Sequence, residues 1–155
     1  MEETTQFHWL KKILTSPRVH TIALVAPPTL GDVPRYFSQI RSLIISKCRK
    51  NTLIFLKPHP NTLLTSELIT AFKEIFFEFN TITPTEANLE LLKAIPLEIL
   101  LSLSLEVFYF GPLTGSAYLL PRTHVYFIGS GSLKERIIAK SNYEAFLQHN
   151  DLQMY

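Results

Sequence analysis

The sequence predicts an α/β protein built around a single parallel sheet. Short apolar runs rich in β-branched and aromatic residues alternate with longer segments whose apolar residues recur at helical spacing. Loops that contain Pro or Gly separate these segments. Strands and helices in this alternation form parallel sheets with right-handed crossovers and helices on both faces. The 155 residues, of which 46% are hydrophobic, suffice for one such core.

The first half of the chain shows the alternation most clearly. Its predicted elements are, in order, an amphipathic helix at 7–14, a strand at 21–25, a helix at 32–47, a strand at 52–56 and a helix at 66–76. Pro17 closes the first helix, because proline cannot continue a helical hydrogen-bond ladder. Asp32 is a typical N-cap residue for the second helix.

The second half continues the pattern with shorter elements. We expect a weak strand at 80–82, a short helix from Pro96, strands at 105–110 and 124–128, a helical turn after Gly115 and a mostly helical segment at 132–149. Proline suits the first turn of a helix, which supports the helix at Pro96. A Rossmann-like doubly wound parallel sheet of about five strands is the most economical architecture for these elements.

One domain accounts for most of the chain. Residues 1–19 are interpreted as an N-terminal helix and linker, and residues 20–155 as the Rossmann-like domain. The single cysteine, Cys48, cannot form an internal disulfide, and the N-terminus shows no basic and then apolar leader, so a cytoplasmic location is expected. The longest apolar stretch, 95–110, contains Glu98 and Glu106, so no transmembrane helix is expected.

Positive charge is concentrated near the N-terminal end of the sequence. Eight of the 15 Lys and Arg residues, but only three of the 13 Asp and Glu residues, fall in the first fifty positions. The cations between 35 and 50 are Arg35, Arg41, Lys47, Arg49 and Lys50. The preferred interpretation is a solvated helix end whose cations complement the helix dipole. Peripheral contact with anionic lipid of the inner membrane is left open, and nucleic acid is not expected as a partner.

Candidate binding residues lie in three loops that follow predicted strands. Ligands of doubly wound sheets bind at the carboxyl ends of the strands, so the loops at 26–31, 57–61 and 111–118 are expected to open onto one crevice. Gly31 closes the first loop. In the second loop, Pro58 and Pro60 restrict the backbone on both sides of His59, beside the cationic Lys57.

His59 and the third loop offer anion-binding chemistry. A histidine held in place can donate a hydrogen bond to a phosphate oxygen or protonate a leaving group; alternatively it caps a nearby carbonyl between two turn prolines. Thr114, Gly115 and Ser116 fall where a helix begins, so free N–H groups and hydroxyls can face an anion. The alternative there is an ordinary Ser/Thr N-cap.

Three segments together resemble a known family. These are "LIFLKPHP", "IPLEILL" and "FYFGPLTGSAYLL", which look like the C-terminal domain of bacterial sialyltransferases and polysialyltransferases with a GT-B fold. The family pattern is an HP dipeptide after a strand, then a P-x-E segment, then a serine motif at a later strand end. Here these are His59-Pro60, Pro96-Leu97-Glu98 and Gly115-Ser116, and the resemblance covers about residues 20–130.

The resemblance implies roles for particular residues. His59 would contact the CMP phosphate as the catalytic histidine, Glu98 would hold the cytidine ribose, and the Ser116 hydroxyl would bind the phosphate. Gly115 replaces the first serine of the motif, so Thr114 is the substitute for that contact. The predicted nucleotide site is Gly31, Lys57, His59, Pro60, Glu98, Thr114, Gly115 and Ser116. No cofactor or metal is expected, because the five histidines show no paired metal-ligand spacing.

The resemblance also implies that the chain is the C-terminal, donor-binding half of a GT-B glycosyltransferase. It would bind CMP-sialic acid for inverting transfer to a glycan acceptor of lipooligosaccharide or capsule. The acceptor site and its general base belong to an N-terminal domain, which a separate chain or a homo-oligomer would have to replace. Two alternatives stay open: a catalytically inactive nucleotide-binding module, and a CDP-glycerol-type transferase domain like that of teichoic-acid polymerases.

Overall fold

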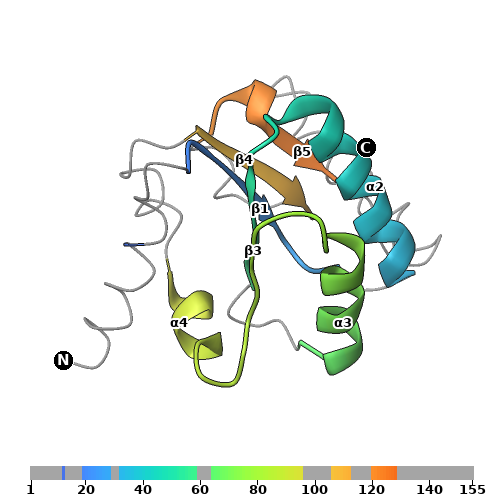
Figure 1. Ribbon diagram of the computed structural model, residues 1–155, viewed down its shortest axis with the longest axis vertical. Helices are drawn as coiled ribbons and strands as arrows, with labels where there is room; N and C mark the ends of the chain where they lie inside the picture. Colours follow the sequence, from blue (N-terminus) through green and yellow to red (C-terminus); the bar gives the residue numbers. More distant parts are fainter. Residues whose placement is uncertain are drawn as a thin grey trace.

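Five parallel strands form one sheet in the order β3-β2-β1-β4-β5, as seen in the computed structural model of the chain (Figure 1). The structure describes residues 12, 19–28, 32–58, 64–95, 106–112 and 120–128. The strands are β1 (Thr21–Val25), β2 (Leu53–Leu56), β3 (Thr81–Ile82), β4 (Glu106–Gly111) and β5 (Val125–Phe127). All four neighbouring pairs are parallel. The predicted α/β class with a Rossmann-like sheet is confirmed.

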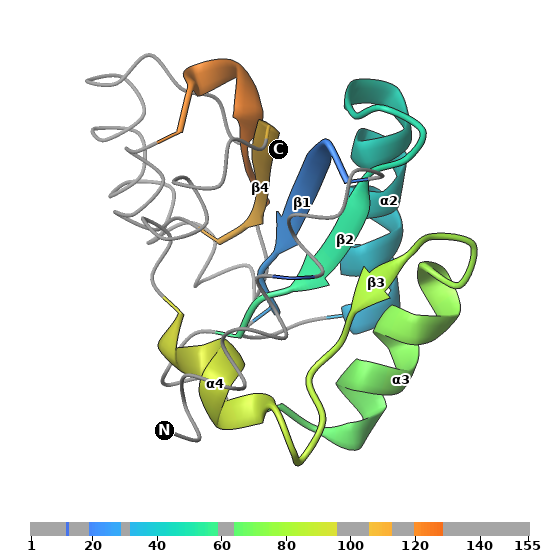
Figure 2. The ribbon, with the colours of Figure 1, turned by 60° about the vertical axis from the view of Figure 1, so that its left-hand side comes forward.

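Helices lie on both sides of the sheet. α2 (Val33–Lys47) and α3 (Ser66–Ile75) lie side by side on one face, and α4 (Leu89–Ala94) lies on the opposite side (Figure 2). This placement follows from right-handed crossovers, since the connections leading to β2 and β3 run across the sheet in one direction and that from β3 to β4 runs in the other.

The helix starts follow from local side-chain chemistry. The Asp32 carboxylate accepts the N–H of Arg35 at 3.2 Å, and proline occupies the first turn of α2. The Thr65 hydroxyl oxygen accepts the N–H of Leu68 at 3.1 Å, which caps α3. Each cap satisfies an N–H group that has no partner inside its helix.

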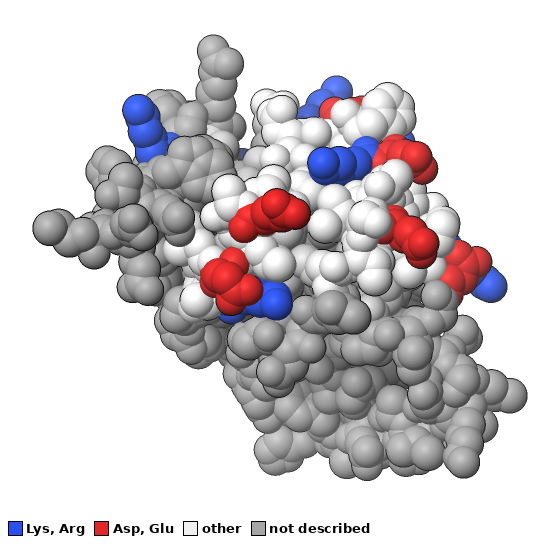
Figure 3. All heavy atoms as spheres, turned by 90° about the horizontal axis from the view of Figure 1, so that it is seen from below, with Lys and Arg blue, Asp and Glu red and all other residues white. Residues whose placement is uncertain are grey.

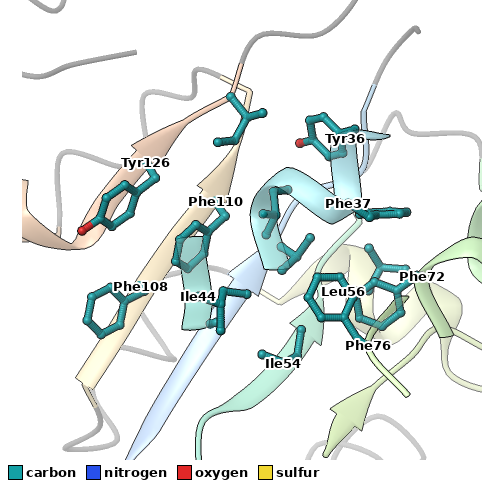
Figure 4. Packing of buried hydrophobic residues seen from close by; sticks show 14 of the residues in the cluster. Tyr36, Phe37, Ile44, Ile54, Leu56, Phe72, Phe76, Phe108, Phe110 and Tyr126 are labelled. Carbon is teal, nitrogen blue, oxygen red and sulfur yellow. The ribbon is translucent and has the colours of Figure 1, made fainter. Parts of the chain in front are cut away.

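Aromatic rings dominate the core between the sheet and the pair α2 and α3 (Figure 4). Phe37 of α2 meets Phe72 of α3 edge to face, with ring centroids 5.6 Å apart, and the rings of Phe72 and Phe76 are 5.0 Å apart. Alternate strand residues supply the other side of this core, among them Phe110, whose ring stacks on Tyr126 at 5.1 Å. Edge-to-face and offset packing is the favoured geometry of aromatic pairs.

The other face of the sheet is buried as well. Ile22, Leu24, Phe55, Val107 and Phe127, which alternate with the residues of the first core, are each at most 3% exposed. A parallel sheet with both faces covered needs near-continuous apolar strands. This is why the strands of this chain read as uninterrupted hydrophobic runs and not as polar and apolar residues in alternation.

The strands and two long helices match the predicted ranges within one residue. α4 and a short 3₁₀ helix, η2 (Arg122–His124), were not predicted from the sequence. α4 has six residues and one buried side chain, Leu92, too short a stripe to show helical periodicity. The predicted helices at 96–100 and 132–149 and the turn after Gly115 lie outside the described residues, as does all of 7–14 except Lys12, which is helical.

Candidate functional site

The three loops singled out from the sequence leave the sheet side by side. The Ala26 N–H donates to the Phe110 carbonyl at 2.9 Å, and the Lys57 N–H donates to the Val25 carbonyl at 3.0 Å. These bonds join the carboxyl ends of β4, β1 and β2. The sheet order reverses between β1 and β4, and such a topological switch point is the usual ligand crevice of a doubly wound sheet.

Most of the predicted site residues fall outside the described part of the chain. These are Gly31, His59, Pro60, Glu98, Thr114, Gly115 and Ser116. Their roles stay predictions. Lys57 is the predicted site residue whose surroundings the structure describes.

The Lys57 amine is engaged with backbone carbonyls. Its Nζ donates to the Pro58 carbonyl oxygen at 3.2 Å and to the Lys93 carbonyl oxygen, in the last turn of α4, at 3.5 Å. A cation at this place complements the partial negative charge of a helix C-terminus. Burial lowers the pKa of Lys57 to about 8. In this arrangement Lys57 ties the end of β2 to α4 and retains a positive charge at the crevice below about pH 8.

Gly111 sits at the switch point because a larger residue does not fit there. A Cβ atom at this position would lie 2.5 Å from the Ala26 Cβ and 2.9 Å from the Tyr109 hydroxyl oxygen. The close approach brings the starts of the first and third loops together. The glycine directly after an apolar strand run is the sequence signal for such an approach.

Two tyrosine hydroxyls hold the first residues of these loops. Tyr36, in α2, donates to the Ala26 carbonyl oxygen at 2.8 Å, and Tyr109 donates to the Pro112 carbonyl oxygen at 2.6 Å. Burial raises the pKa of Tyr36, so its hydroxyl keeps the proton that it donates. Neither tyrosine was predicted from the sequence, where each is one aromatic residue among many.

The described surface on the crevice side carries both acidic and basic side chains. Figure 3 views the molecule from the side where α3 begins and α4 lies, and shows Asp and Glu side chains spread over its white surface with Lys and Arg side chains among them. Exposed acids near these elements are Asp32, Glu67, Glu86 and Glu90. Because Asp32 already caps α2, an anion at this helix start would face a carboxylate.

A polar cluster lies at the opposite, amino edge of the sheet. Glu106 accepts hydrogen bonds from the Thr21 hydroxyl and shares one with His124 Nε2, both at 3.2 Å. Its carboxylate also lies 3.8 Å from Arg49 Nε. The hydrogen bond with His124, aided by Thr21 and Arg49, lowers the pKa of Glu106. The cluster joins the starts of β1, β4 and β5 to the end of α2, which is a structural role.

Metal and thiol chemistry finds no support in the residues that the structure describes. Among them, no group of three or more His, Cys, Asp or Glu side chains is placed to hold a metal ion. Cys48 is half-buried, and burial raises its thiol pKa to about 12. The thiolate, which is the nucleophilic form, is therefore scarce at neutral pH.

Within the residues that the structure describes, no helix is both long and apolar enough to cross a membrane.

The fold is that of an α/β protein whose strand order changes direction between β1 and β4. The chain matches no family model, and neither curated proteins nor solved structures show similarity to it. The fold class therefore rests on the strand order, the parallel register and the placement of the helices.

Proposed function

We propose that this chain is the nucleotide-sugar-binding half of a glycosyltransferase and that it takes CMP-sialic acid at the crevice between β1 and β4. The observation that carries the proposal is the hydrogen-bonded alignment of the ends of β2, β1 and β4. The two loops with the HP and Thr-Gly-Ser motifs begin at two of these ends.

The reach of the chain supports a shared phosphate site. Neighbouring strands lie about 4.8 Å apart, so the ends of β2 and β4 are about 10 Å apart, with β1 between them. His59 follows Lys57 by two residues and Ser116 follows Gly111 by five. An extended residue spans at most about 3.5 Å, which gives both side chains enough reach to meet at one phosphate.

The chemistry follows from the charge that develops on the leaving group. An acceptor hydroxyl, deprotonated by a carboxylate, attacks the anomeric carbon with inversion while CMP departs. Negative charge then grows on a single phosphate, which a histidine and a few N–H and O–H donors can stabilise. Lys57 adds a positive charge close to His59. The acceptor and its base would come from another domain or chain.

The direct test is a thermal-shift titration with CMP, cytidine and UMP. CMP should raise the free energy of unfolding by about 2.7 kcal/mol at a concentration a hundredfold above its Kd. UMP should bind more weakly by about 1–3 kcal/mol, since a group that pairs with the cytosine amino group is left without a partner. His59→Ala and, more mildly, Ser116→Ala should weaken CMP but leave cytidine nearly unchanged, and Glu98→Gln should weaken both.

His20→Ala is the matched control, because His20 is an exposed histidine just before β1, at the other edge of the sheet. It should leave the CMP shift unchanged. A folded wild-type chain with no CMP-dependent shift would remove the proposal. If CDP-glycerol displaces bound CMP at a lower concentration than CMP-sialic acid does, the CDP-glycerol-type alternative is favoured.

A further inference from the structure

The segment from α2 to the start of β2 carries an unbalanced charge. Between 33 and 50 there are five cations and no carboxylate. Arg41 is paired with Glu78, whereas Lys47, Arg49 and Lys50 cluster at the end of α2 and are exposed. Arg49 approaches Glu106, but 76% of its side chain remains exposed. The end of α2 thus presents three solvated positive charges.

Two large apolar side chains are exposed at the same end of the molecule. Of the described residues, Ile45 is 56% exposed and Phe77 is 78% exposed. Ile45 lies in the last turns of α2, and Phe77 follows the C-cap residue of α3, Phe76. The Arg41–Glu78 ion pair joins α2 to the segment after α3, one turn before Ile45. Glu74 and Glu78 are exposed carboxylates near Phe77, and Glu78 is the one paired with Arg41. The excess positive charge at this end is therefore carried by Lys47, Arg49 and Lys50, and exposed apolar groups beside such cations suit a surface that is itself apolar and anionic.

We propose that Ile45, Phe77, Lys47, Arg49 and Lys50 form a membrane-binding surface for anionic lipid. The lysines and the arginine would contact lipid headgroups, and Phe77 and Ile45 would enter the interface between headgroups and acyl chains. A single-stranded nucleic acid would satisfy the cations but offers no apolar phase for the aliphatic Ile45. The observations therefore favour lipid.

The charge distribution also sets the orientation. Helices α2 and α3 run antiparallel to the strands they follow, so their ends lie at the amino edge of the sheet. The carboxyl edge carries both signs of charge, with Asp32, Glu67, Glu86 and Glu90 near Arg35, Lys57 and Lys93. An anionic membrane therefore attracts the first edge more strongly than the second. The bound protein would keep its switch-point crevice turned away from the lipid and open to ligands.

The test is co-sedimentation with vesicles of phosphatidylcholine alone and of phosphatidylcholine mixed with phosphatidylglycerol. We expect binding to the mixed vesicles and a decrease with added salt. Lys47→Gln combined with Lys50→Gln should weaken binding about thirty-fold, at about 1 kcal/mol for each cation near the surface. Arg35→Gln combined with Lys93→Gln removes the same charge at the other end of α2 and at α4, and it should have little effect.

A second pair of variants examines the apolar contact. Phe77→Ser should weaken binding to the mixed vesicles without changing thermal unfolding, because the ring is exposed. Phe77→Trp should add a tryptophan signal that shifts to the blue with mixed vesicles, relative to the parent protein with its one Trp. Equal losses in both double variants would overturn the proposal. So would vesicle binding that RNA abolishes and that Phe77→Ser leaves unchanged.

Discussion

At the scale of single residues, the ends of β1 and β4 are held by contacts to backbone groups. Gly111 lets the end of β4 approach Ala26, and Tyr36 and Tyr109 hold the carbonyls of Ala26 and Pro112. These residues act before any ligand arrives. They fix where the first and third loops begin.

Gly111→Ala should destabilise the protein by about 1–3 kcal/mol, the usual cost of overpacking a filled site. The new methyl would overlap the Ala26 Cβ, which lies 2.5 Å from the position it would take. Adding Ala26→Gly should restore part of the loss, because it removes one of the two clashing groups. Urea unfolding of the single and double variants measures this, and a Gly111→Ala protein as stable as wild type would contradict the described close approach.

The Glu106 cluster predicts a dependence of stability on pH. Folding lowers the pKa of Glu106 from its ordinary value of 4.5, so the carboxylate stabilises the fold above that pH, and the contribution is lost as the pH falls through the lowered pKa. Glu106→Gln should therefore flatten the acid side of the stability profile. Urea unfolding across the acidic range, with the exposed Glu90→Gln as control, measures the slope. Identical slopes for wild type and Glu106→Gln would exclude this role.

At the scale of elements, the helices begin where short polar side chains cap them. Asp32 and Thr65 each accept an N–H three residues further on. Asp32 was predicted as a cap from the sequence, because a capping residue there precedes an apolar stripe, whereas the cap at Thr65 was not predicted. α4 differs, because its start is held by the reciprocal bonds of Thr85 and Asn88. Its end meets the amine of Lys57, 36 residues earlier in the chain.

Thr65→Ala should cost about 1 kcal/mol of stability, since the N–H of Leu68 loses its partner. Thr65→Asn keeps a side-chain acceptor at the cap and should remain close to wild type. Thermal unfolding monitored by circular dichroism distinguishes the two variants. Equal melting temperatures for all three proteins would show that this cap contributes nothing to the stability of α3.

At the scale of the whole molecule, the two edges of the sheet differ. The switch point between β1 and β4 opens at the carboxyl edge, and the large apolar residues exposed in the described part, Ile45 and Phe77, lie at the other edge. Donor binding and membrane contact therefore use opposite ends of the sheet in our two proposals. Each can be removed by substitution without touching the other.

The isolated chain should bind CMP but should not transfer sialic acid to a lactosyl acceptor. Two-domain transferases close a cleft around both substrates, and the acceptor side with its general base is expected on a separate domain. The measurement is product formation from CMP-sialic acid by the purified chain, with an intact sialyltransferase as the positive control. Turnover at the rate of an intact enzyme would contradict this prediction.

The sequence by itself determined the α/β class and the bounds of β1, α2, β2 and α3. These elements are predictable because buried strands and amphipathic helices leave local patterns of apolar residues, and because their caps and loops use residues with known preferences. The motifs at 57–60 and 114–116 were likewise visible, since they require only residue order. Their assignment to a CMP site remains a proposal.

Only the tertiary structure decided which strand ends meet and what they bring together. The order β3-β2-β1-β4-β5 places Lys57 beside Val25 and Gly111 beside Ala26. It also brings Glu106 to His124 and Arg41 to Glu78. Such contacts join residues up to 85 positions apart, and they depend on packing and crossover direction. A pattern within one segment of the sequence does not specify how that segment packs or in which direction a crossover runs.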